Sequence, residues 1–289
     1  MHSFDFASPT SVSDAVALMA KEGSNARMLA GGTDLLIGMR VGRSTPGVVI
    51  DAKQIPELCQ YTLNGNGLEL GAGVTCRTLY EDEAICSAYP ALIDSARLIG
   101  GMQTQGRATI GGNLCNAAPS GDSIPTLIVL GAVAKVVGPD GEREIAVEDV
   151  CVAPGKTSLA DNELLISINI PAAAANSGAC FLRFIPRNEM DIAIASVASS
   201  VVLSADGGTF ETARIALGAV GPTPIFAQAA GDLLAGKPVS EESIQAAADA
   251  AEAASTPITD MRGTIEQRKD LINVLTKRTL REAVSRAQG

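Results

Sequence analysis

Two glycine-rich segments carry the residue types best suited to holding a polar ligand. In the first glycine segment, Ala30-Gly31-Gly32-Thr33-Asp34-Leu35, two glycines let the main chain turn sharply and leave backbone N–H groups open to a ligand. Such N–H groups can cradle a pyrophosphate. The Thr33 hydroxyl can donate a hydrogen bond, and Asp34 can cap a helix or accept a hydrogen bond from a cofactor hydroxyl. The alternative for this segment alone is an ordinary strand-to-helix turn, because glycine turns are common.

A denser polar run follows at residues 109–125, TIGGNLCNAAPSGDSIP, which we call the second glycine segment. An unpaired buried polar group costs about 1 to 3 kcal/mol. The polar groups of this segment must therefore form hydrogen bonds with one another or with a polar ligand. A dinucleotide offers enough donors and acceptors. Neither segment forms GxGxxG followed by an acidic residue about 20 positions later, so a Rossmann site is not predicted.

Composition excludes several kinds of chemistry. The only histidine is His2, which leaves no Ser-His-Asp triad, no site of several histidines and no histidyl-linked flavin. The cysteines lie far apart without CxxC spacing, so we expect reduced thiols rather than a zinc or iron–sulfur site. They are Cys59, Cys76, Cys86, Cys115, Cys151 and Cys180. We therefore predict neither a catalytic acid or base nor a metal ligand in this chain.

Charge and hydropathy narrow the expected partners. The net charge of −10 and the scattered lysines and arginines form no basic stripe, so nucleic acid and anionic membranes are not expected to bind. The N-terminus lacks a basic leader, and no apolar run reaches the roughly 18 to 20 residues that span a bilayer. We expect a cytoplasmic protein without membrane insertion.

Strand-like and helix-like patterns alternate around the two glycine segments. A helix is expected at 10–22, beginning near Ser11 and ending at Gly23, and a strand at 27–30 leads into the first glycine segment. Further elements are expected as a helix opening at 33–37, strands at 47–51 and 164–170, and a helix at 91–99. Two hairpins are expected, one at 63–70 and one in which 132–137 pairs with 144–147 across the turn at 138–141. After a linker at 171–178, strands are expected at 179–185, 192–204 and 209–219, then helices near 224–235, 240–254 and 262–286. Strands followed by helices indicate an α+β fold.

The two glycine segments together resemble the flavin-binding signatures of a known family. AGGTDL followed by TIGGNLCNAAPSGDSIP is similar to the FAD-binding medium subunit of molybdenum hydroxylases, the xanthine dehydrogenase and carbon monoxide dehydrogenase flavoprotein family. The resemblance extends to ELLISINIP, to residues 181–193 and to the closing EQRKDLINVLTKRTLREAV, and so covers essentially the whole chain.

This resemblance implies a fold and its boundaries. The expected α+β fold begins with a two-subdomain FAD-binding domain of the p-cresol methylhydroxylase and vanillyl-alcohol oxidase type at 1–175, with subdomains of about 1–57 and 58–175. A C-terminal flavoprotein domain at 176–289 would hold a three-stranded antiparallel sheet and a helix bundle.

The resemblance also implies which residues bind FAD, without a covalent bond. Both glycine segments would wrap the pyrophosphate, Leu114 and Cys115 would face the isoalloxazine ring, and Ser120 and Asp122 would bind the ribityl hydroxyls. The full set of expected contacts is Met28, Leu29, Ala30, Gly31, Gly32, Thr33, Asp34, Leu35, Thr109, Ile110, Gly111, Gly112, Asn113, Leu114, Cys115, Ser120, Asp122, Leu165, Arg183 and Asp191.

Several of these residues have a plainer alternative. Asp122 can be the N-cap of a following helix, and Cys115 can be a small core residue rather than the site of a covalent flavin link. Arg183 and Arg187 can lie on a solvated strand face with weak ion pairs. One stretch also departs from the family, because residues 105–108 stand where relatives often have an Arg-Asn pair, so the electrostatics near the phosphates can differ.

The family function implied is electron transfer within a larger complex. In such complexes a large molybdopterin subunit oxidises the substrate, a small [2Fe-2S] subunit carries single electrons, and FAD passes electron pairs to an external acceptor. We expect a dimer of heterotrimers, in which the substrate pocket lies on the molybdenum subunit. The alternatives are a self-contained flavin oxidoreductase of the vanillyl-alcohol oxidase type, or a non-catalytic binding or assembly module with structural glycine turns.

Overall fold

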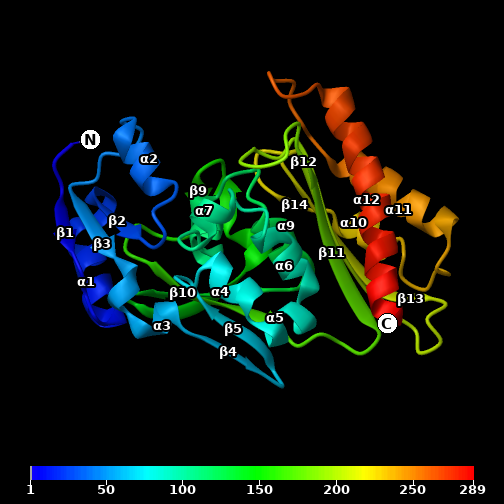
Figure 1. Cartoon of the computed structure of the whole chain (residues 1–289), viewed down its shortest axis with the longest axis horizontal. Helices are drawn as coiled ribbons and strands as arrows, with labels where there is room; N and C mark the ends of the chain where they lie inside the picture. The colour runs from blue at the N-terminus through cyan, green and yellow to red at the C-terminus, as the bar shows by residue number, and fades with distance from the viewer. Residues whose placement is uncertain (1) are drawn as a thin grey trace.

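The computed structural model describes residues 2–289 and begins with a small N-terminal unit. Its parallel sheet has the strand order β1-β3-β2 and lies at the left of Figure 1. The strands are β1 (Asp5–Ala7), β2 (Ala26–Leu29) and β3 (Val48–Asp51), and the helices are α1 (Val12–Glu22) and α2 (Leu35–Arg40). The predicted ends of α1 are confirmed, because the Ser11 side chain caps its first turn and Gly23 terminates it at φ 52°.

A five-stranded antiparallel sheet forms the middle unit, with the order β4-β5-β10-β6-β7. Its strands are β4 (Tyr61–Asn64), β5 (Gly67–Gly71), β6 (Val133–Gly138), β7 (Gly141–Ala146) and β10 (Leu164–Pro171), with the separate pair β8 (Cys151–Ala153) and β9 (Lys156–Thr157). Both predicted hairpins, at 63–70 and 132–147, are confirmed by the pairings of β4 with β5 and of β6 with β7.

Short helices separate the middle sheet from the C-terminal unit (Figure 1). They are α4 (Cys76–Glu81), α5 (Glu83–Ala88), α6 (Pro90–Ala96), α7 (Met102–Gln105), α8 (Ile110–Asn116) and α9 (Ser123–Val129), after α3 (Pro56–Cys59) near the N-terminal unit. The 3-10 turns are η1 (Gly23–Asn25), η2 (Ala52–Gln54) and η3 (Val147–Asp149). Helix α9 is buried along its whole length, which explains the apolar run that follows Asp122.

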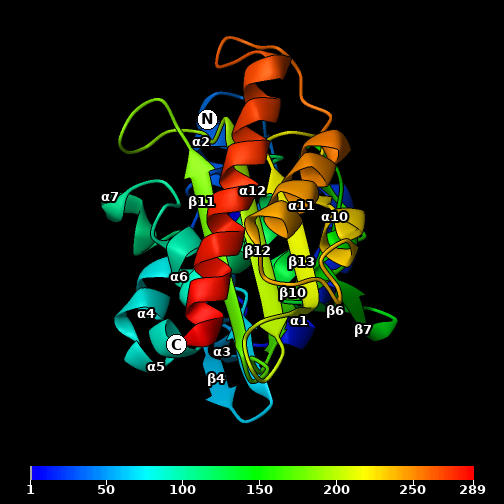
Figure 2. The same ribbon diagram turned by 90° about the vertical axis from the view of Figure 1, so that its right-hand side faces the viewer.

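The C-terminal unit is a four-stranded antiparallel sheet with helices on its outer face (Figure 2). Its elements are β11 (Ser177–Phe184), β12 (Ala195–Leu203), β13 (Phe210–Gly218), β14 (Ile225–Phe226), α10 (Gln228–Asp232), α11 (Glu241–Ala254) and α12 (Ile265–Gln288). The three strands predicted at 179–185, 192–204 and 209–219 are confirmed as β11, β12 and β13, but the expectation of a three-stranded sheet was wrong, and the helix predicted at 224–235 is limited to α10. Ile225 and Phe226 pair with β13 as a fourth strand, which leaves only a five-residue helix behind them.

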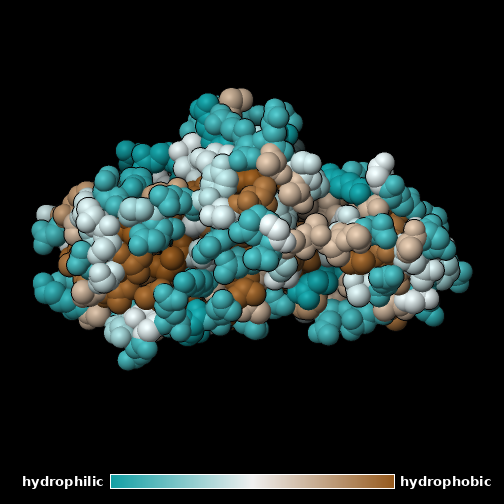
Figure 3. All heavy atoms as spheres, turned by 90° about the horizontal axis from the view of Figure 1, so that it is seen from below, coloured by the Kyte–Doolittle hydropathy of each residue, from teal (hydrophilic) through white to brown (hydrophobic). Residues whose placement is uncertain are grey.

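Helices α6 and α9 pack against the inner face of the C-terminal sheet, while α12 covers the outer face of β11 and β12. One hydrophobic core fills the N-terminal and middle units and reaches Phe181 of β11, and a second core lies beneath α10 to α12. From below, hydrophobic side chains are visible mainly on the half that holds the N-terminal unit (Figure 3). Among residues 2–289, none of the helices has the length and apolar character needed to span a membrane.

An ion pair connects the end of the chain to the middle unit. Arg286 of α12 donates from Nη1 to Asp94 Oδ2 of α6 at 2.7 Å and to the Ala179 carbonyl of β11 at 2.8 Å. The amide of Phe181 also donates to Asp94 Oδ2, at 3.4 Å. Helix α12 approaches β11 closely at Gly178, where a Cβ would lie 2.1 Å from the Ala283 carbonyl oxygen. The C-terminal helix is therefore held both to the middle unit and to the sheet of its own unit.

We predict that Asp94→Ala lowers the free energy of unfolding by about 1 to 2 kcal/mol, because it removes the carboxylate that pairs with Arg286 and accepts from the Phe181 amide. Urea denaturation measures the change. The matched control is Glu282→Ala, which removes only the exposed pair of Arg286 with Glu282 and should cost less than about 0.5 kcal/mol. Equal losses of unfolding free energy in the two variants would show that the Asp94 contact between the units contributes no more than the exposed ion pair with Glu282.

Candidate cofactor-binding site

A cleft of about 730 Å³ opens between the N-terminal and middle units. One wall comes from β2, the first glycine segment and α2, and the opposite wall comes from α8 and the chain between β8 and β10. The two glycine segments are far apart in the sequence, and the fold brings both to this cleft. Its size and its mixture of polar and apolar lining suit a large polar cofactor.

The two glycine segments pack directly against neighbouring main chain. A Cβ on Gly31 would lie 1.9 Å from the carbonyl oxygen of Arg107, just before the second segment. Arg107 Nε in turn donates to the Gly31 carbonyl at 3.2 Å. A Cβ on Gly111 would lie 2.5 Å from the Ala72 carbonyl oxygen. Only glycine permits these approaches, so both segments are shaped by close backbone contact.

The first glycine segment offers a row of free donors to the cleft. Within residues 2–289, the backbone amides of Gly31, Gly32, Thr33 and Asp34 have no hydrogen-bond acceptor. Gly32 has the positive φ of 76°, which turns the chain back toward α2. Successive free amides in such a turn form an anion-binding nest. The predicted alternative role of Asp34 as a helix cap is wrong, because its side chain makes no capping hydrogen bond.

Most of the expected contact residues line this cleft together. They are Met28, Ala30, Gly31, Gly32, Thr33, Asp34, Leu35, Thr109, Gly111, Gly112, Asn113, Cys115 and Leu165. The Thr109 oxygen accepts from the Gly112 amide at 2.9 Å and so caps α8. Cys115 is exposed. The structure therefore places Cys115 on the cleft surface and not in the core, the alternative considered for it.

The remaining expected residues lie outside the cleft lining. Leu29 is buried with Met39 and Val49, and Ile110 and Leu114 are fully buried in the main core. Ile110 and Leu114 are four residues apart on α8, so they share one face of the helix. That face is packed into the core and is therefore not available to a ligand in the cleft. Ser120, Asp122, Arg183 and Asp191 are also absent from the lining.

Asp122 and Arg183 form a buried ion pair between the middle and C-terminal units. Arg183 Nη1 donates to Asp122 Oδ2 at 2.5 Å, and the two side chains are only 5% and 9% exposed. Three buried polar atoms here have no hydrogen-bond partner: Asp122 Oδ1, Arg183 Nε and Ser196 Oγ. Ser196 lies on β12 opposite Arg183 of β11. Burial raises the pKa of Asp122 to about 7, although the Arg183 charge acts in the opposite direction.

The two alternatives for this region have different outcomes. Asp122 stands at the N-cap position of α9 as the alternative expected, although its side chain makes no capping hydrogen bond. The alternative that Arg183 lies on a solvated strand face is wrong, because its side chain is buried. Arg187 is solvated as expected, with a side chain 67% exposed, and its Nε lies 3.6 Å from Asp191 Oδ2. Asp191 thus pairs locally with Arg187.

Several lining residues were not expected from the sequence. They are Met19, Ala26, Arg27, Gly38, Arg43, Ser44, Ala52, Leu58, Ala72, Ile99, Ala108, Asn116, Gly155, Thr157, Leu159, Ala160, Asp161, Glu163 and Leu164. Among these residues in the wall between β8 and β10, only Gly155, with φ of 69°, carries a strong local turn signal. The rest of the unexpected lining residues are ordinary residue types that folding brings together. The described residues contain no group of three or more His, Cys, Asp and Glu side chains arranged to hold a metal ion.

The fold and the cleft define a flavoprotein of the FAD-binding class. Residues 2–173 match the model of the FAD binding domain in molybdopterin dehydrogenase, and residues 181–283 match that of the CO dehydrogenase flavoprotein C-terminal domain. The chain therefore belongs to the family of FAD-binding medium subunits of molybdenum hydroxylases.

Individual relatives span nearly the full length. The carbon monoxide dehydrogenase medium chain of Afipia carboxidovorans is 34% identical, with 99% of each chain covered. The putative xanthine dehydrogenase FAD-binding subunit of Escherichia coli (strain K12) is 32% identical, again with 99% of each chain covered. A solved structure of carbon monoxide dehydrogenase from Hydrogenophaga pseudoflava superposes with a TM-score of 0.94 at 34% identity, covering 99% of this chain and 98% of that chain.

We predict that Gly31→Ala lowers FAD affinity at least about tenfold, because the new Cβ must push the first glycine segment away from Arg107. Fluorescence titration of the cofactor-free chain with FAD measures this. Gly38→Ala is the matched control in the same cleft wall, since its Cβ would meet only Ser44 Cβ at 3.7 Å. Wild-type affinity in Gly31→Ala would contradict the packing argument.

A second prediction concerns the pH dependence of stability. A carboxyl whose pKa rises on folding stabilises the protein below its unfolded pKa of about 4 and loses that contribution as pH rises through the folded value. For Asp122 the window runs from about pH 4 to about 7. The unfolding free energy of the wild type, relative to Asp122→Asn, should therefore fall by about 1 to 3 kcal/mol across this window.

Urea denaturation of the cofactor-free proteins at several pH values checks this expectation. The Asp122→Asn variant is the reference because it cannot titrate and shares every other acidic group with the wild type. A difference that stays flat or rises with pH would show that Asp122 remains ionised beside Arg183.

Proposed function

We propose that this chain is the FAD-binding, electron-transferring subunit of a molybdenum-containing hydroxylase or dehydrogenase. The observation that carries the proposal is the cleft in which two glycine segments meet and four successive backbone amides lack an acceptor. When bound, FAD supplies the exchange between one-electron and two-electron transfer. The chain holds the cofactor and adjusts its surroundings, because the redox chemistry belongs to the cofactor itself.

The residues present fit a dinucleotide. The amides of residues 31–34 would hold the pyrophosphate by donating to its oxygens, and residues 111–113 would close the site from α8. Met28 and Leu165 would give apolar contact on either wall. These positions are taken over from the family motifs and are supported by their common location in the cleft.

The buried pair of Asp122 and Arg183 provides a further polar position outside the cleft lining. One carboxylate oxygen and one guanidinium N–H remain unsatisfied there, which is costly in a buried site unless a ligand or water is bound. We assign these two groups and Ser120 to the flavin half of the cofactor, in agreement with the family pattern. Non-covalent binding is part of this proposal.

The proposed partners follow from the relatives. The named relatives are medium chains or FAD subunits of carbon monoxide dehydrogenase, xanthine dehydrogenase and nicotine 6-hydroxylase. We propose that this chain assembles likewise with a small subunit holding [2Fe-2S] clusters and a large molybdopterin subunit, as a dimer of heterotrimers. Substrate choice then lies with the large subunit.

The proposed domain division places 1–175 in a FAD-binding domain of the p-cresol methylhydroxylase and vanillyl-alcohol oxidase type, with subdomains of about 1–57 and 58–175, and 176–289 in the C-terminal domain. It is supported by the two matched regions, 2–173 and 181–283, and by the strand-free connection at 172–176. A cytoplasmic location is proposed because all six cysteines are free thiols.

We predict that the chain, co-expressed with its partner subunits, copurifies with them and carries about one non-covalent FAD, seen as flavin absorbance that is released on denaturation. Gly31→Ala serves as the comparison, since it should keep the partners and lose the flavin. A chain that stays colourless with added FAD would favour the binding-module alternative. A monomer that oxidises its own substrate would favour the self-contained oxidoreductase.

A further inference from the structure

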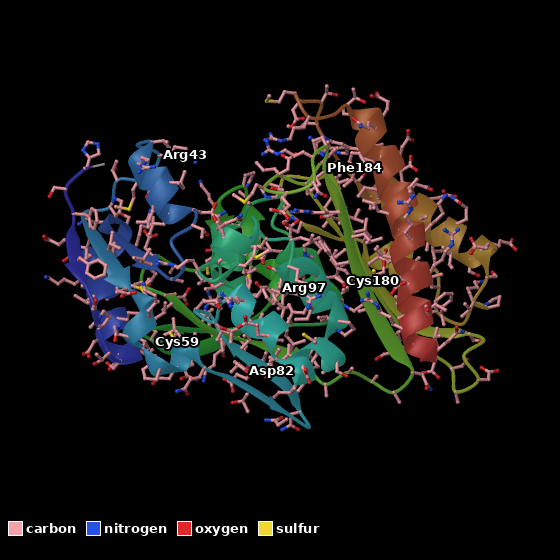
Figure 4. The ribbon with its side chains drawn as sticks, in the orientation of Figure 1. Arg43, Cys59, Asp82, Arg97, Cys180 and Phe184 are labelled. Carbon is pink, nitrogen blue, oxygen red and sulfur yellow. The ribbon has the colours of Figure 1, made fainter. Side chains whose placement is uncertain are left out.

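The cleft lining contains two arginines, Arg27 and Arg43, and of these two only Arg43 has a guanidinium without a partner among residues 2–289. It lines the cleft and is exposed, and within the described part of the chain it forms neither an ion pair nor a side-chain hydrogen bond. Arg27 donates to the carbonyls of Ser24 and Ala26, and Arg107 donates to that of Gly31. Figure 4 shows Arg43 beside the end of α2.

The backbone that carries Arg43 is well defined. Helix α2 ends at Arg40, and Gly42 adopts a φ of 76°, the left-handed conformation that closes helices. The Arg43 amide then donates to the Gly38 carbonyl at 2.9 Å, and the Ser44 amide donates to the same oxygen at 3.3 Å. Gly38 and Ser44 also line the cleft. The chain thus doubles back over α2 and holds Arg43 at the cleft wall.

The charge of the cleft lining leaves Arg43 as a cation without a counter-ion. The lining carboxylates are Asp34, Asp161 and Glu163, and Glu163 is already paired with Arg143 at 2.6 Å. A pyrophosphate is negatively charged, and backbone amides stabilise that charge only through their dipoles. A guanidinium beside it can form charge-assisted, bidentate hydrogen bonds to phosphate oxygens.

We propose that Arg43 binds the adenosine-side phosphate of the dinucleotide and so makes the cleft selective for FAD over FMN. Arg43 belongs to the wall of the N-terminal unit, on the far side from the C-terminal unit (Figure 4). The flavin half is assigned to the side of Asp122 and Arg183, which leaves the adenylate half beside α2. This inference rests on FAD as the occupant of the cleft.

The experiment compares the affinity of the cofactor-free full-length chain for FAD, ADP and FMN. Arg43→Gln should weaken FAD and ADP binding about tenfold or more, the effect expected for a lost hydrogen bond to a charged group, and leave FMN binding unchanged. The FAD affinity of the variant should also depend less on salt than that of the wild type. Arg43→Lys keeps the positive charge but loses the bidentate geometry of the guanidinium, so its affinity for FAD and ADP should be intermediate.

Arg40→Gln is the matched control. It removes the same charge from an exposed position on α2 that does not line the cleft, so its FAD affinity should equal that of the wild type. The proposal is overturned if Arg43→Gln binds FAD as tightly as the wild type, if it loses FMN equally, or if Arg40→Gln loses as much. A wild-type chain that binds no FAD would instead refute the proposed function. An unchanged thermal midpoint shows that Arg43→Gln folds normally.

Discussion

The contact between Gly31 and the Arg107 carbonyl is the constraint on which the site depends. The first glycine segment can face the cleft only because its main chain lies against the chain that leads into α8, with no side chain between them. Arg107 reinforces the contact through its hydrogen bond to the Gly31 carbonyl. The amides of residues 31–34, which adjoin this contact, have no acceptor among residues 2–289. Ligand binding and the joining of two units are therefore one structural feature.

Main-chain geometry, more than side-chain chemistry, builds the cleft. Backbone amides supply most of the proposed donors, and residues such as Met28 and Leu165 supply surface. A site of this kind tolerates substitution at most positions but not at Gly31 or Gly111, whose Cβ atoms would meet backbone. Arg43 is the exception, because a free guanidinium adds both charge and direction.

The C-terminal unit completes the molecule through two polar contacts of different kinds. Arg286 and Asp94 form a partly exposed pair whose hydrogen bonds are shared with backbone groups of β11. Asp122 and Arg183 are buried and keep unsatisfied atoms, so desolvation opposes their mutual attraction. The first pair serves cohesion between units. The second holds unused hydrogen-bonding capacity beside the proposed flavin half of the site.

Local sequence determined much of this protein. The two glycine segments, the ends of α1 and both hairpins follow from turn and capping preferences within a few residues, so they were predictable without the fold. Tertiary structure alone decided that Leu114 turns to the core while Cys115 faces the cleft, that Arg183 is buried against Asp122, and that Ile225 and Phe226 form a strand. It also brought Arg43 and the chain before β10 to the cleft. These features arise from contacts between segments distant in sequence, whose pairing no local preference specifies.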